Sequence, residues 1–326
     1  EAKGIDLRLN RQITHVDPAS KLARDDQGEE YSFESALLAT GGRVRRLPFG
    51  GKAVIYYRTL ADYRRLRALA ENRRRFVVLG GGFIGTEIAA ALTANGKRVT
   101  LVHPGPTLGD RVFPRQLAEF ITFYYGEKGV EVLVGASATD VREAGEGVTV
   151  HVRLADGREQ SIEADGVVAG IGIQPETSLA TAAGIACTNG IEVNEYLETS
   201  ASGVFAAGDV AAFPNRALQE RMRVEHEDNA LTMGKFAGRA MAGNREPYRH
   251  LPSFYSDLFD LGYEAVGDLH PSQTATADWT EPFRKGVVFY TRQGRIRGVL
   301  LWNVWDKVPS ARRLIESGRT FRKEDL

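Results

Sequence analysis

The stretch Phe76–Glu87, FVVLGGGFIGTE, decides the fold of this chain. Its first residues, Phe76–Leu79, form an apolar run typical of a buried strand, and Gly80, Gly82 and Gly85 follow with the spacing G-x-G-x-x-G. Glycines in this pattern let the backbone turn tightly and approach a pyrophosphate, which then lies at the N-terminus of the next helix. The stretch therefore predicts a dinucleotide-binding strand–turn–helix unit.

Residues beyond the glycines continue this alternation of strand and helix. Ile84, Ile88 and Leu92 recur at helical period, and the apolar run Arg98–His103 closes the unit with a second strand. A second helix is expected at Gln116–Lys128. Further strands are expected at Val130–Val134, Val148–Leu154, Gln160–Ile162 and Asp165–Gly172. Parallel strands with helical crossovers and a β-meander are typical of a compact dinucleotide-binding domain.

Composition limits the remaining function classes. The 326 residues carry 42 Lys and Arg against 42 Asp and Glu, so no net field favours nucleic acid, and we expect no nucleic-acid partner. No apolar run approaches the ~18 residues of a membrane span. The single cysteine, Cys187, and six histidines without an HxxxH pair predict no disulfide framework and no metal site. Because residue 1 is Glu, no targeting segment can be read; a cytoplasmic location is the expectation and a mitochondrial one the alternative.

Two other short strands end in glycine turns without starting a second fingerprint. Ser35–Thr40 runs into Gly41, and Val204–Ala207 runs into Gly208 and Asp209. Bare glycine lets an extended cofactor lie against the backbone, and an Asp after such a strand is placed to accept hydrogen bonds from sugar or polyol hydroxyls. On the residues alone, a turn or N-cap role for this Asp is an equal alternative.

Four motifs resemble the flavoprotein reductases with two dinucleotide folds, which carry FAD on one domain and NAD(P)H on the other. They are ATGG at 39–42, GGGFIGTE at 80–87, GIGIQPET at 170–177 and AAGDVA at 207–212. Three motifs of the tail are similar to apoptosis-inducing factor and its relatives, including the ferredoxin reductases, within the pyridine nucleotide-disulfide oxidoreductase family. They are RVEHEDNA (223–230), SFYSDLFDLGYEAVG (253–267) and the block at 285–318.

The resemblance implies an α/β chain with two Rossmann-like dinucleotide-binding domains, the FAD one incomplete, and an α+β C-terminal domain. The expected boundaries are residues 1–47 with 195–249 for FAD, 48–194 for NAD(P)H and 250–326 for the C-terminal domain. The last should hold strands at Glu264–Leu269, Val287–Thr291 and Arg297–Trp302, and a helix at Val308–Glu316. The family's first glycine unit is expected upstream of Glu1, so we expect an N-terminally truncated chain.

The resemblance also implies the NAD(P)H-binding residues. The loop Gly81–Ile84 would hold the pyrophosphate, Gly172 would admit the nicotinamide, and Glu264 would bind its carboxamide with Asn303 at the edge. The full implied set is Gly80, Gly81, Gly82, Phe83, Ile84, Gly85, His103, Arg111, Gly172, Glu225, Glu264 and Asn303.

For FAD, the resemblance implies that Asp209 holds the ribityl chain. Glu87 would lie near the flavin, where relatives pair it with a lysine, and Tyr255 stands where relatives have Trp. The implied FAD set is Thr40, Gly41, Arg45, Gly208, Asp209, His226 and Tyr255. The residues expected next to the flavin are Phe83, Glu87, His226 and Tyr255, and none is required to act as a nucleophile, because the cofactors carry the chemistry.

The choice between NADH and NADPH stays open in the sequence. An Asp or Glu about 20 residues beyond the glycines would bind the ribose 2′-hydroxyl. Here the strand ends at His103–Pro104–Gly105, without a carboxylate. The acid of the relatives aligns with Gly105 and their lysine with Arg111, so His103 and Arg111 could together accept a 2′-phosphate. NADH is favoured on family grounds.

Three functions are consistent with this reading. The first is an FAD-dependent NAD(P)H oxidoreductase like apoptosis-inducing factor, with a small-molecule or carrier-protein acceptor. The second is a ferredoxin or rubredoxin reductase, for which Arg43, Arg45 and Arg46 could supply a docking face. The third is an NADH-sensing redox scaffold with little turnover, in which NADH alters a homodimer.

Overall fold

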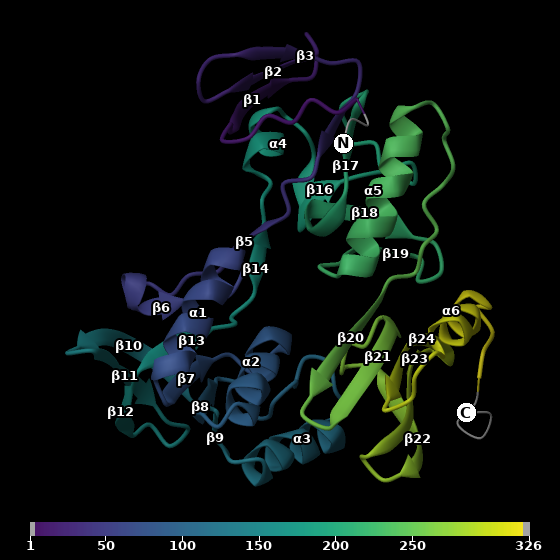
Figure 1. Cartoon of the computed structure of the whole chain (residues 1–326). Helices are drawn as coiled ribbons and strands as arrows, with labels where there is room; N and C mark the ends of the chain where they lie inside the picture. The colour runs from purple at the N-terminus through teal and green to yellow at the C-terminus, as the bar shows by residue number, and fades with distance from the viewer. Residues whose placement is uncertain (1–3, 322–326) are drawn as a thin grey trace. The chain divides into compact units, whose positions relative to one another are not determined.

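The computed structural model describes residues 4–321, which form two compact units (Figure 1). The first unit comprises residues Glu1–Arg43 and Gln174–Pro252, and the second comprises Val44–Ile173 and Ser253–Leu326. The strands β5 (Gly42–Val44) and β14 (Ile173–Pro175), in which the chain passes between the units, pair with each other.

A five-stranded parallel sheet is the centre of the second unit, in the order β6-β13-β7-β8-β9. Its strands are β6 (Val54–Ile55), β7 (Arg75–Leu79), β8 (Arg98–His103), β9 (Val130–Val134) and β13 (Gly166–Ala169). The middle strands are buried along nearly their whole length, as expected for a parallel sheet covered on both faces. This is the dinucleotide-binding sheet that the glycine motif predicts.

Helices and a smaller sheet complete this half of the unit. The helices are η1 (Gly51–Ala53), α1 (Leu60–Asn72), α2 (Phe83–Ala94) and α3 (Arg115–Glu127), and the antiparallel strands are β10 (Ser137–Ala144), β11 (Gly147–Arg153) and β12 (Glu159–Ala164). Helix α1 begins with a capping box in which Thr59 and Asp62 bond reciprocally. Helix α2, in contrast, has Gly82 as its N-cap residue and therefore no side-chain cap.

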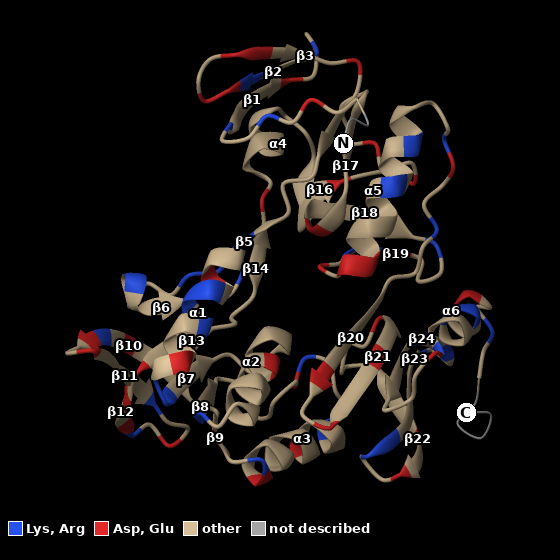
Figure 2. Cartoon of the chain, viewed as in Figure 1, with Lys and Arg blue, Asp and Glu red and all other residues tan. Residues whose placement is uncertain are grey.

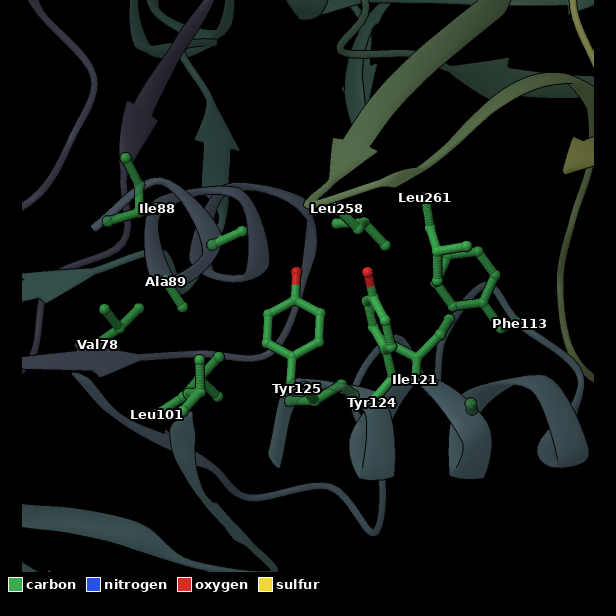
Figure 3. Close-up of a cluster of buried hydrophobic side chains, with 14 of the residues drawn as sticks. Val78, Ile88, Ala89, Leu101, Phe113, Ile121, Tyr124, Tyr125, Leu258 and Leu261 are labelled. Carbon is green, nitrogen blue, oxygen red and sulfur yellow. The ribbon is translucent and has the colours of Figure 1, made fainter. Parts of the chain in front are cut away.

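The C-terminal segment of the second unit is an antiparallel sheet in the order β20-β21-β24-β23-β22, with α6 packed against β21 and β24. The elements are β20 (Ser253–Leu258), β21 (Leu261–Gly267), β22 (Thr274–Glu281), β23 (Lys285–Arg292), β24 (Arg295–Trp302) and α6 (Val308–Glu316). Its apolar face shares one core with the parallel sheet: Figure 3 shows Tyr124 and Tyr125 of α3 extending from the helix toward Leu258 and Leu261. The two sheets of this unit are therefore held by a continuous core.

In its described residues, the first unit contains three small sheets, two α-helices and one short 3₁₀ helix. Its strands are β1 (Ile13–Asp17), β2 (Leu22–Asp25), β3 (Glu30–Ser32), β4 (Ala36–Leu38), β15 (Cys187–Thr188), β16 (Gly190–Glu192), β17 (Val204–Ala206), β18 (Ala211–Asn215) and β19 (Glu220–Arg223). Its helices are α4 (Ser178–Ala182), η2 (Gly208–Val210) and α5 (Glu227–Met241). Strands β4 and β17 pair in parallel, so their carboxyl ends meet at the same edge.

One expected strand needs correction, and the compact units are divided differently from the expected domains. The run Asp165–Gly172 is not one strand: β13 ends at Ala169, and the chain then turns through Gly172, whose φ is +91°. Residues 174–194, assigned to the NAD(P)H domain from the sequence, belong to the first unit, while the C-terminal segment clusters with the parallel sheet. The three-domain division stays a prediction. Within residues 4–321, no helix is long and apolar enough to cross a membrane.

Candidate cofactor-binding site

The glycine motif forms a tight loop between β7 and α2. Gly80 has a φ of +106°, and a Cβ on Gly85 would lie 1.8 Å from the carbonyl oxygen of Gly80, so neither position tolerates a side chain. Gly82 differs from both, because a Cβ there would meet no atom within 4 Å. The exposed side of Gly82 and the uncapped first turn of α2 leave backbone N–H groups available to an anion. This geometry fits the pyrophosphate of a dinucleotide.

His103, at the end of β8, is hydrogen-bonded to the same loop. Its Nδ1 accepts a hydrogen bond from the Gly81 backbone N–H at 3.1 Å, and its Nε2 lies 3.3 Å from Asp110 Oδ1. The imidazole is buried. Arg111, its predicted companion, is exposed on the following loop.

One face of α2 contacts one face of β20. Phe83 and Glu87 are four residues apart and so share a helix face, while Phe254 and Ser256 alternate along the strand. The rings of Phe83 and Phe254 are 5.2 Å apart in an edge-on arrangement, and Ser256 Oγ donates to Glu87 Oε1 at 2.5 Å. Burial raises the pKa of Glu87, which the Ser256 hydrogen bond partly offsets and the nearby Asp257 carboxylate reinforces. The folded protein thus favours the protonated form of the Glu87 carboxyl group more than water does.

Tyr255 and Glu264 lie on the opposite face of the β20–β21 hairpin. They are direct cross-strand partners, so their side chains share a face, whereas the neighbouring Ser256 points the other way. Tyr255 is 68% exposed. Glu264 Oε2 is buried and has no hydrogen-bond partner among residues 4–321, and burial raises the pKa of this carboxyl group. An orphaned buried oxygen of this kind fits a ligand donor such as the carboxamide expected there.

Asn303 shapes the turn after β24. Its φ is +49°, its Oδ1 accepts from the Gly262 N–H at 2.8 Å, and its Nδ2 donates to the Arg284 carbonyl at 2.9 Å. Both the oxygen and the nitrogen of the Asn303 side-chain amide therefore have hydrogen-bond partners within the C-terminal segment.

Gly172 and Arg45 lie together within the second unit. The Arg45 N–H donates to the Gly172 carbonyl at 2.9 Å, and Arg45 Nε donates to the Ile173 carbonyl at 3.2 Å. The other two arginines of the expected docking face are also held: Arg46 lies over the Tyr56 ring, and Arg43 pairs with Glu176.

In the first unit, the predicted FAD residues follow two paired parallel strands. Thr40 and Gly41 come after β4, and Gly208 and Asp209 come after β17, at the same carboxyl edge. Both glycines have positive φ, +63° and +78°. Ligands of open α/β sheets bind outside the carboxyl ends of the strands, so these residues fit an extended cofactor.

His226 and Glu225 precede helix α5. Burial lowers the pKa of His226 to about 4, although the carboxylates of Asp209 and Asp228 oppose the shift, so the imidazole is neutral at physiological pH. Glu225 is exposed and pairs with Arg223 at 2.7 Å. The Arg223 guanidinium also donates to the Asp209 carbonyl, which fixes the turn that follows β17.

Two residues of this geometry were missed by sequence reasoning. Ser256 is 169 positions from Glu87, and no local pattern links them. Asp110 lies beyond the end of β8, where a carboxylate was sought at Gly105. A signal existed for the second: glycine at the expected acidic position, followed by an aspartate in the same short loop.

No group of three or more potential metal ligands occurs in the described part of the chain.

Comparison with known proteins identifies the family of the chain. The family model described as pyridine nucleotide-disulphide oxidoreductase matches residues 1–234, and that of the C-terminal part of apoptosis-inducing factor, mitochondrion-associated, matches residues 268–317. Monodehydroascorbate reductase 3 of Arabidopsis thaliana is 36% identical over 315 residues, covering 92% of this chain and 71% of the relative.

Bacterial reductases match along more of the chain. The ferredoxin–NAD(+) reductase component of the anthranilate 1,2-dioxygenase system of Burkholderia cepacia is 33% identical over 324 residues, covering 98% of this chain and 78% of that protein. Among solved structures, the reductase in the covalent putidaredoxin reductase–putidaredoxin complex superposes with a TM-score of 0.86 at 26% identity, covering 98% of this chain and 81% of the other. The chain therefore belongs to the pyridine nucleotide-disulphide oxidoreductase family and is an FAD-dependent NAD(P)H oxidoreductase.

Proposed function

We propose that this chain uses NAD(P)H to reduce a small ferredoxin-type iron–sulfur protein. The observation that carries the proposal is the match to a ferredoxin–NAD(+) reductase over 98% of the chain, which includes both the glycine motif and the C-terminal sheet. The structural similarity to a reductase solved with its protein partner supports it. The ferredoxin reductase, given second in the sequence analysis, is therefore preferred over an oxidoreductase like apoptosis-inducing factor, given first. The match to apoptosis-inducing factor covers residues 268–317 alone.

The residues of the second unit would bind and orient NAD(P)H. The uncapped N-terminus of α2 would hold the pyrophosphate, with Gly82 allowing its close approach. Glu264, with its orphaned Oε2, would accept a hydrogen bond from the nicotinamide carboxamide and so fix the ring. NAD(P)H and FAD, when bound, supply the hydride and electron transfer themselves.

The residues expected near the flavin would set the protonation state and the polarity of the flavin's surroundings. Glu87, with its raised pKa, can hold a proton on its carboxyl group, and the Ser256 hydroxyl fixes the orientation of that group. His226 would present a neutral imidazole, because its pKa is about 4. Asp209 would accept hydrogen bonds from the ribityl hydroxyls at the carboxyl edge of β17.

Reduction of the monodehydroascorbate radical is the second candidate. It is favoured by one observation, the 36% identity to a plant monodehydroascorbate reductase. The two candidates share the NAD(P)H and FAD sites and differ in the acceptor alone.

An acceptor comparison separates them. The FAD-loaded chain is given NADH and either a ferredoxin or monodehydroascorbate generated enzymatically from ascorbate, and NADH consumption is followed. We expect ferredoxin to accelerate consumption and to become reduced in proportion. Acceleration by monodehydroascorbate alone would favour the second candidate, and acceleration by neither would contradict both.

A further inference from the structure

We propose that Asp110 selects NADH over NADPH by providing, from the loop after β8, the carboxylate that binds the adenosine ribose 2′-hydroxyl. This inference rests on the proposed use of a nicotinamide dinucleotide. It assigns the cofactor preference that the sequence leaves open.

The carboxylate of Asp110 occupies the place of the missing acidic side chain. Gly105 stands at the end of β8, about 20 residues beyond the glycine motif, where an acid binds the ribose in NAD-specific folds. A Cβ on Gly105 would lie 2.0 Å from Asp110 Oδ2 and 2.5 Å from His103 Nε2. Gly105 is therefore required to admit the Asp110 carboxylate, and the two residues together replace a single acid.

The loop that carries Asp110 is fixed beside the glycine motif. The Gly109 N–H donates to the Gly81 carbonyl at 3.0 Å. The Leu108 N–H donates to Thr122 Oγ1 at 2.9 Å, and Leu108 itself is fully buried. The Asp110 side chain retains 22% exposure. The carboxylate is thus held in place and still accessible to a ligand.

His103 is the positioning residue for this carboxylate. Because the Gly81 N–H is a donor, His103 Nδ1 must accept, and the neutral ring then carries its proton on Nε2, facing Asp110 Oδ1. Asp110 Oδ2 stays on the Gly105 side.

This arrangement opposes the alternative in which His103 and Arg111 bind a 2′-phosphate. His103 is buried, and both of its ring nitrogens already face partners. A phosphate at the 2′ position would instead meet the Asp110 carboxylate, and two like charges in close contact repel. A ribose diol can donate hydrogen bonds to the same group.

The test measures binding of two fragments that lack the nicotinamide, ADP-ribose and 2′-phospho-ADP-ribose, by calorimetry. The wild-type chain should bind ADP-ribose more tightly. Asp110→Asn keeps an oxygen acceptor for His103 but removes the charge, and it should reduce the preference by about tenfold or more. Glu119→Gln is the matched control, an exposed acid on α3 that pairs with Arg115, and it should leave the ratio unchanged.

A variant that keeps the charge separates loss of the carboxylate from loop damage. Asp110→Ala should lose the preference, and Asp110→Glu, which keeps a carboxylate on the same loop position, should still prefer ADP-ribose. An unchanged ratio in Asp110→Asn, or a wild-type chain that binds both fragments equally, overturns the inference and leaves the proposed function standing. A wild-type chain that binds neither fragment overturns both.

Discussion

Ser256 on β20 donates a hydrogen bond to Glu87 on α2, with 2.5 Å between Ser256 Oγ and Glu87 Oε1. The bond stabilises the charged form of a carboxyl group whose pKa burial raises. It joins the helix that follows the glycine motif to the C-terminal sheet, within a single unit and a shared core. A proton on Glu87 is therefore coupled to the packing of α2 on that sheet.

Ser256→Ala should raise the pKa of Glu87 further. A carboxyl group with a raised folded-state pKa lowers stability as the pH rises from the unfolded pKa toward the folded one, because over this range the unfolded chain releases its proton while the folded chain keeps it. The variant should lose about 1 kcal/mol more than wild type between pH 4.5 and pH 8, a small value because Glu87 is partly exposed. Urea unfolding at several pH values measures this. Ser310→Ala, on the exposed side of α6, is the control, and an equal pH dependence in Ser256→Ala and Ser310→Ala would contradict the coupling.

His226 should make the protein less stable in mild acid. Its pKa is about 4 in the folded chain against 6.5 ordinarily, so below pH 6.5 the unfolded chain binds a proton that the folded chain does not. Unfolding free energy should therefore fall by about 2 kcal/mol from pH 7.5 to pH 5 on account of this residue. His226→Gln should remove that part of the pH dependence, whereas His15→Gln, an exposed change in the same unit, should not. An unaltered slope in His226→Gln would show that the imidazole does not control it.

Gly82→Ala and Gly85→Ala separate folding from dinucleotide binding. The Gly85 variant should be destabilised by about 3 kcal/mol or more, because its Cβ would lie 1.8 Å from the Gly80 carbonyl oxygen. A Cβ on Gly82 meets no protein atom within 4 Å, so this variant should keep its thermal stability and lose dinucleotide affinity by about tenfold or more. Thermal unfolding and calorimetric titration with ADP-ribose give the two readouts. Normal affinity in Gly82→Ala would place the pyrophosphate elsewhere.

Glu264→Gln should weaken binding of the nicotinamide end alone. Replacing the carboxylate keeps the shape but removes the charge-assisted acceptor at the buried Oε2, and affinity for NAD⁺ should fall by about tenfold. Affinity for ADP-ribose, which has no carboxamide, should stay at the wild-type value. Equal losses for both ligands would indicate a structural role for Glu264.

Much of the fold could be predicted because its elements have strong local patterns. The strands Arg98–His103 and Val130–Val134 and the helix Val308–Glu316 have the bounds that the sequence predicts. The passage between the two compact units at β14 coincides with no change in composition, so the sequence gives no local signal for it.

Relationships between distant residues could not be predicted. The contact of Ser256 with Glu87 depends on how a helix and a distant strand pack. Asp110 was overlooked because its carboxylate reaches back over Gly105 from a loop, and loop conformation has no sequence period. The roles of the predicted cofactor-binding residues remain predictions for the experiments above.

The most direct test of the central claim is rapid anaerobic mixing of the FAD-loaded chain with NADH, first alone and then with an oxidised ferredoxin. We predict that NADH alone bleaches the flavin absorbance once, and that ferredoxin restores it while becoming reduced, so that turnover depends on the carrier. Flavin that NADH leaves unbleached, or bleached flavin that ferredoxin does not reoxidise, would contradict the account.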